Sequence, residues 1–238
     1  MKLNPGALAR GLALAAVLVP AASSADPRPA VVELFTSQGC SSCPPADVLL
    51  GELAGRHDVL ALSMHVDYWD KYGWPDRFAL PAVKQRQFAY VRHFGKDWVY
   101  TPDMVIDGHI DVLGVDRPSL EKQLAAPRSG VPVQIVADGA QLLVSVPAAA
   151  SAQEGEVLLV SYQPAAVTSI GRGENAGREL HEANVVRSLA MLGHWSGAAT
   201  QWRVELKSLP PEADHFAVLV QEPGPGPIIG ATSTVISR

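Results

Sequence analysis

The stretch Gly39-Cys40-Ser41-Ser42-Cys43-Pro44-Pro45 decides how this chain is expected to fold. Before it, Val31–Thr36 is a short apolar run with β-branched residues, which is typical of a buried strand. After it, the two prolines fit the first turn of a helix, where a missing N–H costs no hydrogen bond, and Gly55 can end that helix. The sequence therefore predicts a strand, a Cys-x-x-Cys turn and a helix in succession.

Cys40 and Cys43 are the only two cysteines among the 238 residues. A sulfur at the N-terminus of a helix faces unpaired N–H groups and the positive end of the helix dipole, which stabilise a thiolate. The second sulfur, one turn later, is close enough to resolve a mixed disulfide. As a purely structural staple, so short a loop would contribute only about 2 kcal/mol through chain entropy. We therefore favour a redox pair over a structural disulfide.

Further elements follow along the first half of the chain in an α/β order. Pro81 suits the first turn of a helix, and Asp116 suits the N-cap of another. The expected elements are a strand at Val59–Val66, a helix at Pro81–Phe94, a strand at Met104–Ile106 before a turn at Asp107-Gly108, and a helix from Asp116 to Leu124.

The second half has a different pattern, which begins after a candidate linker at Pro127–Pro132. Short apolar runs separated by Gly, Pro and Asp clusters predict a small β-sandwich. Asn184–Trp195 fits either a strand or a helix, and both alternatives stay open. The expected strands are Val133–Val136, Leu142–Val146, Val157–Tyr162, Arg203–Leu206, Phe216–Val220 and Ile228–Val235, with a hairpin turn at Asp138-Gly139.

Three segments resemble the thioredoxin superfamily and, more closely, a secreted thioredoxin-like family known as domain of unknown function 1223. They are residues 31–47 around the cysteines, His65-Val66-Asp67-Tyr68-Trp69, and residues 100–108, which include Thr101-Pro102; shorter similarities are Gly173-Glu174-Asn175 and Asn184-Val185-Val186-Arg187. The resemblance implies a thioredoxin-like domain, a central mixed sheet flanked by helices, over residues 30–126. Residues 68–100 would be an insertion, and residues 132–238 a β-rich domain.

The resemblance also implies roles for individual residues. Cys40 would be the nucleophile, Cys43 the resolving thiol and Pro102 a cis-proline facing the cysteines. Backbone groups beside Thr101 would then pair with an extended substrate. The functional expectation is a thiol–disulfide oxidoreductase that needs no dissociable cofactor and acts on protein or peptide thiols and disulfides, with a membrane redox protein as one possible partner.

The chain departs from many thioredoxins at two positions beside the cysteines. Gly39 stands where those proteins have a tryptophan, and Leu34 where they have a buried acid. No residue is therefore assigned to receive the proton of Cys43. Glu33 is adjacent, but alternation along the strand points its side chain to the opposite face. Ser41 and Ser42 lie between the cysteines and are candidate hydrogen-bond donors to a thiolate.

Residues 68–100 hold ten of the fifteen aromatic residues of the chain. Aromatic side chains offer large contact areas at low entropic cost, so this segment can line a substrate groove, with Tyr68 and Trp69 as its first candidates. The insertion also needs a small core of its own, which would use the same side chains. Both interpretations are kept.

A copper-binding or copper-delivery protein is the main alternative function. Two thiolates with the thioether of Met64 or the imidazole of His65 would suit Cu(I), a soft ion. We favour Met64 in the core and His65 in a hydrogen bond, because two cysteines make only half of a usual thiolate site. A redox-inactive binding module stapled by the two cysteines is the third alternative.

Gly171–Arg178 is a polar, glycine-rich segment in the second half. It lacks the Gly-Lys-Ser/Thr sequence of a phosphate-binding loop and follows no βαβ strand. Its length and polarity favour a surface loop. The alternative is that this segment reaches the cysteines of the first domain.

Residues 1–25 have the features of an export signal: Lys2 and Arg10, the apolar run Gly11–Val19, and small residues at Ser23 and Ala25. We therefore expect a periplasmic or secreted protein in an oxidising compartment, with no membrane span after cleavage. The formal net charge is -5, and no run of basic residues occurs, which argues against nucleic-acid binding.

Overall fold

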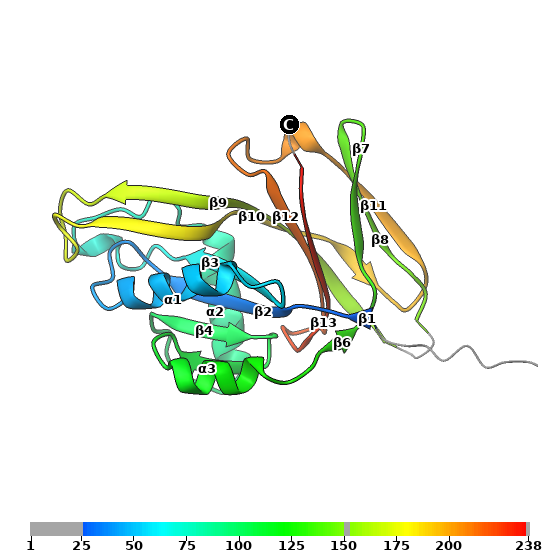
Figure 1. Cartoon of the computed structure of the whole chain (residues 1–238), viewed down its shortest axis with the longest axis horizontal. Helices are drawn as coiled ribbons and strands as arrows, with labels where there is room; N and C mark the ends of the chain where they lie inside the picture. The colour runs from blue at the N-terminus through cyan, green and yellow to red at the C-terminus, as the bar shows by residue number, and fades with distance from the viewer. Residues whose placement is uncertain (1–25, 150–152, 237–238) are drawn as a thin grey trace, which may run out of the picture.

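The computed structural model describes residues 26–149 and 153–236, and the predicted export signal at residues 1–25 lies outside them. Its largest element is an eight-stranded mixed sheet with the strand order β13-β12-β9-β10-β3-β2-β4-β5 (Figure 1). None of the helices in the described part of the chain is long and apolar enough to span a membrane.

The first half of the chain forms one end of this sheet. Strands β2 and β3 are parallel, and β4 and β5 continue the sheet in antiparallel pairs. Asp116 caps α3 by accepting a hydrogen bond from the Ser119 N–H, and Gly55 ends α1. The elements are β1 Asp26–Pro27, β2 Ala30–Thr36, α1 Pro44–Ala54, β3 Val59–His65, the 3-10 helix η1 Asp70–Tyr72, α2 Pro81–His93, β4 Asp103–Ile106, β5 Ile110–Leu113 and α3 Arg117–Leu124.

Strands from the second half complete the same sheet. The long strands β9 and β10 form a hairpin, and β10 pairs in parallel with β3 at Val185 and Ser63. The segment Asn184–Trp195, for which the sequence allowed either a strand or a helix, is thus part of a strand. The elements are β6 Ser129–Gly130, β7 Gln134–Asp138, β8 Gln141–Val146, β9 Gly155–Ser169, β10 Glu179–Trp195, β11 Thr200–Glu205, η2 Leu206–Ser208, β12 His215–Gln221 and β13 Ile228–Val235.

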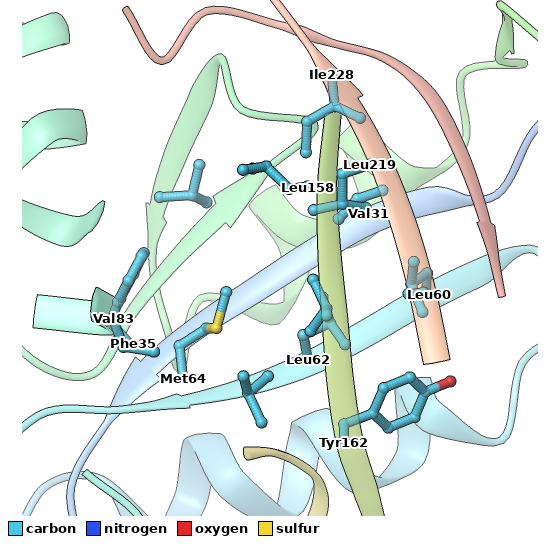
Figure 2. Close-up of a cluster of buried hydrophobic side chains, with 14 of the residues drawn as sticks. Val31, Phe35, Leu60, Leu62, Met64, Val83, Leu158, Tyr162, Leu219 and Ile228 are labelled. Atoms are coloured by element: carbon cyan, nitrogen blue, oxygen red, sulfur yellow. The ribbon is translucent and has the colours of Figure 1, made fainter. Parts of the chain in front are cut away.

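Alternation along the strands gives the sheet two buried faces. In β2, Val31 and Phe35 point into a cluster that also contains Val83 of α2, and Figure 2 shows this cluster. The intervening residues Val32 and Leu34 point to the other face, where side chains of α1 and α3 cover them. Every residue of β2 and β3 is buried, as expected for strands covered on both sides.

A second, three-stranded sheet of β11, β8 and β7 packs on the far part of the large sheet. Val157 and Leu159 of β9 face this small sheet, whereas Leu158 and Val160 face the cluster of Figure 2. The protein is therefore a mixed α/β protein with one large mixed sheet. Strands from both sides of the predicted boundary at 126–132 belong to that sheet.

A buried ion pair lies inside the cluster of Figure 2 and joins α2 to two strands. The Arg86 guanidinium donates to both carboxylate oxygens of Glu33, at 2.6 and 2.9 Å. The Tyr90 hydroxyl donates to Glu33 at 2.6 Å, and Gln221 of β12 donates to that hydroxyl at 2.9 Å. Glu33 thus points away from the face that α1 and α3 cover, as alternation predicts. Both of its buried carboxylate oxygens accept hydrogen bonds from these partners.

We predict that Glu33→Gln lowers the free energy of unfolding by about 3–5 kcal/mol, because it leaves the buried Arg86 without a carboxylate. The double variant Glu33→Gln with Arg86→Met should recover much of this loss, since neither charge is then buried. Chemical denaturation measures both. Glu52→Gln, which breaks an exposed pair with Arg117, is the control and should cost less than about 1 kcal/mol.

Candidate functional site

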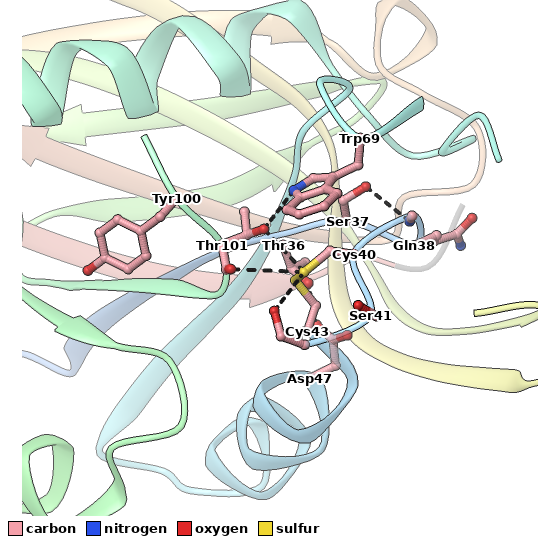
Figure 3. The surroundings of a disulfide bond; sticks show 12 residues. Thr36, Ser37, Gln38, Cys40, Ser41, Cys43, Asp47, Trp69, Tyr100 and Thr101 are labelled. Atoms are coloured by element: carbon pink, nitrogen blue, oxygen red, sulfur yellow. Dashed lines mark hydrogen bonds between the residues drawn. A yellow bond between two sulfur atoms is a disulfide. The ribbon is translucent and has the colours of Figure 1, made fainter. Parts of the chain in front are cut away.

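Cys40 and Cys43 form a disulfide at the junction of β2 and α1, with their Cα atoms 5.4 Å apart (Figure 3). Cys43 is the N-cap of α1, and Pro44 and Pro45 occupy its first turn, as predicted. The Cys40 N–H donates to the Ser37 carbonyl at 3.1 Å, which closes the turn before the helix. Both cysteines are fully buried in this oxidised form.

Thr101 lies against the disulfide from the loop before β4, and Pro102 is the next residue along the chain. The Thr101–Pro102 peptide bond is cis, in agreement with the resemblance. The Thr101 hydroxyl donates to the Cys40 sulfur at 3.2 Å. Gly114 donates its N–H to the Pro102 carbonyl at 3.0 Å, and a Cβ at this glycine would lie 2.8 Å from the Pro102 Cβ. A residue without a side chain is therefore required at position 114.

Trp69 from the aromatic segment covers the turn before the first cysteine. Its indole N–H donates to the Thr101 hydroxyl at 2.8 Å, as Figure 3 shows. A Cβ at Gly39 would lie 3.0 Å from the Trp69 Cβ, so the glycine leaves room for this tryptophan. Many thioredoxins have a tryptophan where this chain has Gly39, and here Trp69, from a distant segment, lies beside that position instead.

The other predicted contact residues occupy different positions around the disulfide. The Ser42 hydroxyl lies 3.3 Å from the Cys40 sulfur, whereas Ser41 is exposed and uses its N–H to bind Glu174. Tyr68 is half-buried, donates to Gln87 at 3.3 Å and packs on the cluster of Figure 2. The aromatic segment therefore contributes both to the core and to the surroundings of the cysteines.

Asp47 is a buried acid that sequence reasoning did not identify. It lies four residues after Cys43, and therefore on the same side of α1, and this spacing is the signal that could have identified it. Its carboxylate accepts a hydrogen bond from the Thr36 hydroxyl at 2.7 Å. Burial raises the pKa of Asp47 to about 7, although the nearby His65 opposes this shift.

His65 lies at the end of β3 among buried carboxyl groups. Its Nδ1 lies 2.7 Å from Asp76, and its Nε2 lies 3.9 Å from Glu182 of β10. Burial alone would lower the pKa of His65, but Asp76, Glu182 and Asp47 together raise it to about 9. Burial raises the pKa of Glu182, whereas His65 holds that of Asp76 below its usual range despite burial. His65 and Asp76 are thus an ion pair.

Met64 does not face this polar group. Its side chain lies in the apolar cluster of Figure 2, which contains neither cysteine, and the next residue along the strand, His65, is held by Asp76. Among residues 26–149 and 153–236, no three His, Cys, Asp or Glu side chains are grouped so that they can hold a metal ion. No observation on these residues favours the copper alternative.

The glycine-rich segment after β9 is a surface loop, since six of the eight residues 171–178 are exposed, and it also reaches the cysteines, as the alternative expected. Asn175 is buried, and its side-chain amide donates to the carbonyls of Gln38 and Cys40, at 2.9 Å each. Glu174 accepts a hydrogen bond from the Ser41 N–H at 3.3 Å. Packing of the β9–β10 hairpin against β3 and α1 brings this loop there, and no local pattern in the sequence reports that packing.

The raised pKa of Asp47 predicts a pH-dependent cost to stability. The folded protein holds this proton up to about pH 7, whereas the unfolded chain releases it near its ordinary value of 3.8. Wild type therefore loses stability as pH rises between these values. Asp47→Asn keeps an acceptor for Thr36 and has no such cost, so we expect its free energy of unfolding to gain on wild type by a few kcal/mol over this window.

Denaturation of both proteins from pH 4 to pH 8 measures the difference. Asp58→Asn is the control, because Arg56 holds the pKa of this exposed carboxyl below its usual range. That variant should lose stability relative to wild type as pH rises. Parallel curves for wild type and Asp47→Asn would show that the Asp47 carboxyl ionises in the folded protein as easily as in the unfolded chain.

Comparison with known proteins places the chain. The family described as "Protein of unknown function (DUF1223)" matches residues 31–221. A crystal structure of a protein from Agrobacterium tumefaciens is similar, with a TM-score of 0.77 and 28% identity over 90% of this chain and 96% of that one. HBP35 of Porphyromonas gingivalis has a TM-score of 0.59 at 14% identity, over 88% of this chain and 76% of that one, which shows a shared fold alone. No curated protein matches. The chain belongs to the DUF1223 family.

Proposed function

We propose that this protein is a thioredoxin-like thiol–disulfide oxidoreductase. The observation that carries the proposal is the Cys40–Cys43 disulfide at the start of α1, with the Thr101 hydroxyl 3.2 Å from the Cys40 sulfur. Cysteines spaced in this way at a helix N-terminus form reactive thiolates. The proposal assigns Cys40 as the nucleophile and Cys43 as the resolving thiol.

The topology around the cysteines supports a thioredoxin-like domain. The strand order β3-β2-β4-β5, with β2 parallel to β3 and β4 antiparallel to β2, places the redox helix directly after the central strand. Helix α2 covers one face, and α1 and α3 cover the other. The small sheet of β7, β8 and β11 on β9 and β12 supports the proposal of a sandwich-like C-terminal part.

Disulfide exchange follows from these residues in two balanced steps. The Cys40 thiolate attacks one sulfur of a substrate disulfide, forms a mixed disulfide and releases the other substrate sulfur as a thiolate. The Cys43 thiolate then attacks the Cys40 sulfur, which forms the internal disulfide and releases the second substrate thiol. Two electrons pass from the cysteine pair to the substrate. The reverse sequence oxidises a substrate dithiol.

Asp47 is suited to receive the proton that Cys43 must lose before the second step. It lies on the cysteine side of α1, and its pKa of about 7 allows it to take up and release a proton near neutral pH. His65 and Asp76 also act on Asp47, but their opposite charges already compensate each other in an ion pair. Asp47 thus takes the role of the buried acid that many thioredoxins have at the position of Leu34, whose side chain cannot accept a proton.

The proposed substrates are protein or peptide thiols and disulfides. Thr101 precedes β4 and can present backbone groups to an extended segment, which is a common mode of peptide binding. Trp69 and Tyr68 lie beside it and offer apolar contact area. The export signal expected at residues 1–25 supports a periplasmic or secreted location, in which such a disulfide persists.

The first test is to trap substrates with Cys43→Ser. Without the resolving thiol, the mixed disulfide at Cys40 has no intramolecular exit, so adducts should accumulate on non-reducing gels of periplasmic extract. Cys40→Ser is the control and should show none. Equal labelling of both variants, or no adducts with either, would contradict the proposed mechanism and favour a stapled binding module.

The second test concerns the proton of Cys43. Asp47→Asn cannot accept a proton, so the step that closes the internal disulfide should slow by about 10²-fold or more at neutral pH. The attack of Cys40 on a substrate disulfide should change little. Stopped-flow measurement of both steps separates them, and an unchanged closing step in Asp47→Asn would remove Asp47 from the mechanism.

A further inference from the structure

The loop at residues 170–178, between β9 and β10, packs against the cysteine turn in the first half of the chain. Figure 1 shows the hairpin of these two strands running along the side of α1, and α1 packs against β10. Asn175 is the innermost residue of the loop, with only 1% of its surface exposed. Its amide nitrogen donates to two carbonyl oxygens of the turn before the helix, those of Gln38 and Cys40, at 2.9 Å each.

Gln38 anchors the same turn to the hairpin through its side chain. Its amide nitrogen donates to Thr168 of β9 at 2.9 Å and to Glu182 of β10 at 2.8 Å. Its amide oxygen accepts a hydrogen bond from the Trp74 indole at 3.0 Å. The turn that carries the first cysteine is therefore held from the second half of the chain by four hydrogen bonds of Gln38 and Asn175.

Gly173 fixes the depth to which the loop enters. Its φ of +81° lies in the left-handed region, and a Cβ there would lie 3.1 Å from the Trp74 Cβ and 3.3 Å from the Tyr72 carbonyl oxygen. Gly177, in the same loop, has a φ of +80° and nothing within 4 Å of a built Cβ. These two glycines share a backbone conformation and differ in contact, which makes them a matched pair.

We propose that Asn175 is a positioning residue of the redox site: it holds the turn that carries Cys40 and offsets the dipoles of two carbonyl groups of that turn. The inference rests on the proposed function of Cys40. The two carbonyl groups belong to Cys40 itself and to Gln38, two residues before it. The negative end of a carbonyl dipole in the same turn disfavours a thiolate, and an amide that donates to both carbonyls offsets this effect. The second half of the chain thereby contributes to the reactivity of Cys40 as well as to the fold.

Glu174 should act in the opposite direction. Its carboxylate accepts from the Ser41 N–H at 3.3 Å and places a negative charge beside the cysteine turn. A nearby negative charge disfavours a thiolate, but Glu174 is exposed and salt screens it. Neighbouring residues of one loop are therefore expected to have effects of opposite sign.

The test is the rate at which iodoacetamide alkylates Cys40 of the reduced protein, measured against pH with the adduct mapped by mass spectrometry. For Asn175→Ala we expect the midpoint of the profile to move to higher pH. The rate below the midpoint should fall by about 3- to 10-fold, the worth of one or two lost hydrogen bonds. The plateau at high pH should be retained. Glu174→Gln should move the midpoint to lower pH, and 1 M salt should abolish that shift.

Gly173→Ala and Gly177→Ala keep the proposal testable if Asn175→Ala folds poorly. Both carry the same strain of a side chain at positive φ, but only Gly173→Ala displaces the loop. We expect Gly173→Ala to shift the midpoint as Asn175→Ala does, and Gly177→Ala to retain the wild-type profile. Equal midpoints in all variants, or faster alkylation at every pH with an unchanged midpoint, would overturn the proposal. Either result would show that the loop only shields Cys40 from the reagent.

Alkylation needs no exchange activity, so the two proposals fail in different ways. If wild type exchanges no disulfides but the midpoint still moves in Asn175→Ala, the proposed function is wrong and the positioning role stands. If wild type exchanges disulfides and the midpoint does not move, the reverse holds.

Discussion

The pairing of β10 with β3 is the interaction on which the rest of the structure depends. Val185 of β10 pairs with Ser63 of β3, which converts the edge of a small sheet into the middle of an eight-stranded one. Asn184 supports the junction, with φ of +48° and a hydrogen bond from its side chain to the Ala61 carbonyl at 2.9 Å. Unpaired backbone groups at a buried strand edge are costly, so this junction holds the two halves together.

The same pairing determines what surrounds the cysteines. The hairpin loop lies beside the carboxyl ends of β2 and β3, because Asn175 contacts Cys40, which follows β2, and Gln38 contacts Glu182 of β10. Glu182 is brought within 3.9 Å of His65. One buried cation then faces three buried carboxyl groups, and the low dielectric of the interior favours the proton-bound form of those it does not neutralise.

Local patterns in the sequence were sufficient for the elements and for the cysteine pair. Pro44, Pro81 and Asp116 act within a few residues of themselves, so their helices begin where the sequence predicts. The cysteine pair and the Thr-Pro motif carry their chemistry in short stretches, and the structure brings Thr101 to Cys40. Membership of the DUF1223 family rests on a match over residues 31–221.

The long-range contacts were decided by the tertiary structure alone. Asp47 is charged or neutral according to its burial against Thr36 and His65, and no spacing in the sequence reports that burial. Asn175 lies 135 residues from Cys40 along the chain, and the packing of the β9–β10 hairpin against α1 and β3 makes them neighbours. By itself the sequence determined local structure and the place of the cysteine pair, because those depend on adjacent residues. The environment of the pair depends on strand pairing between distant segments, which hydrophobic periodicity does not specify.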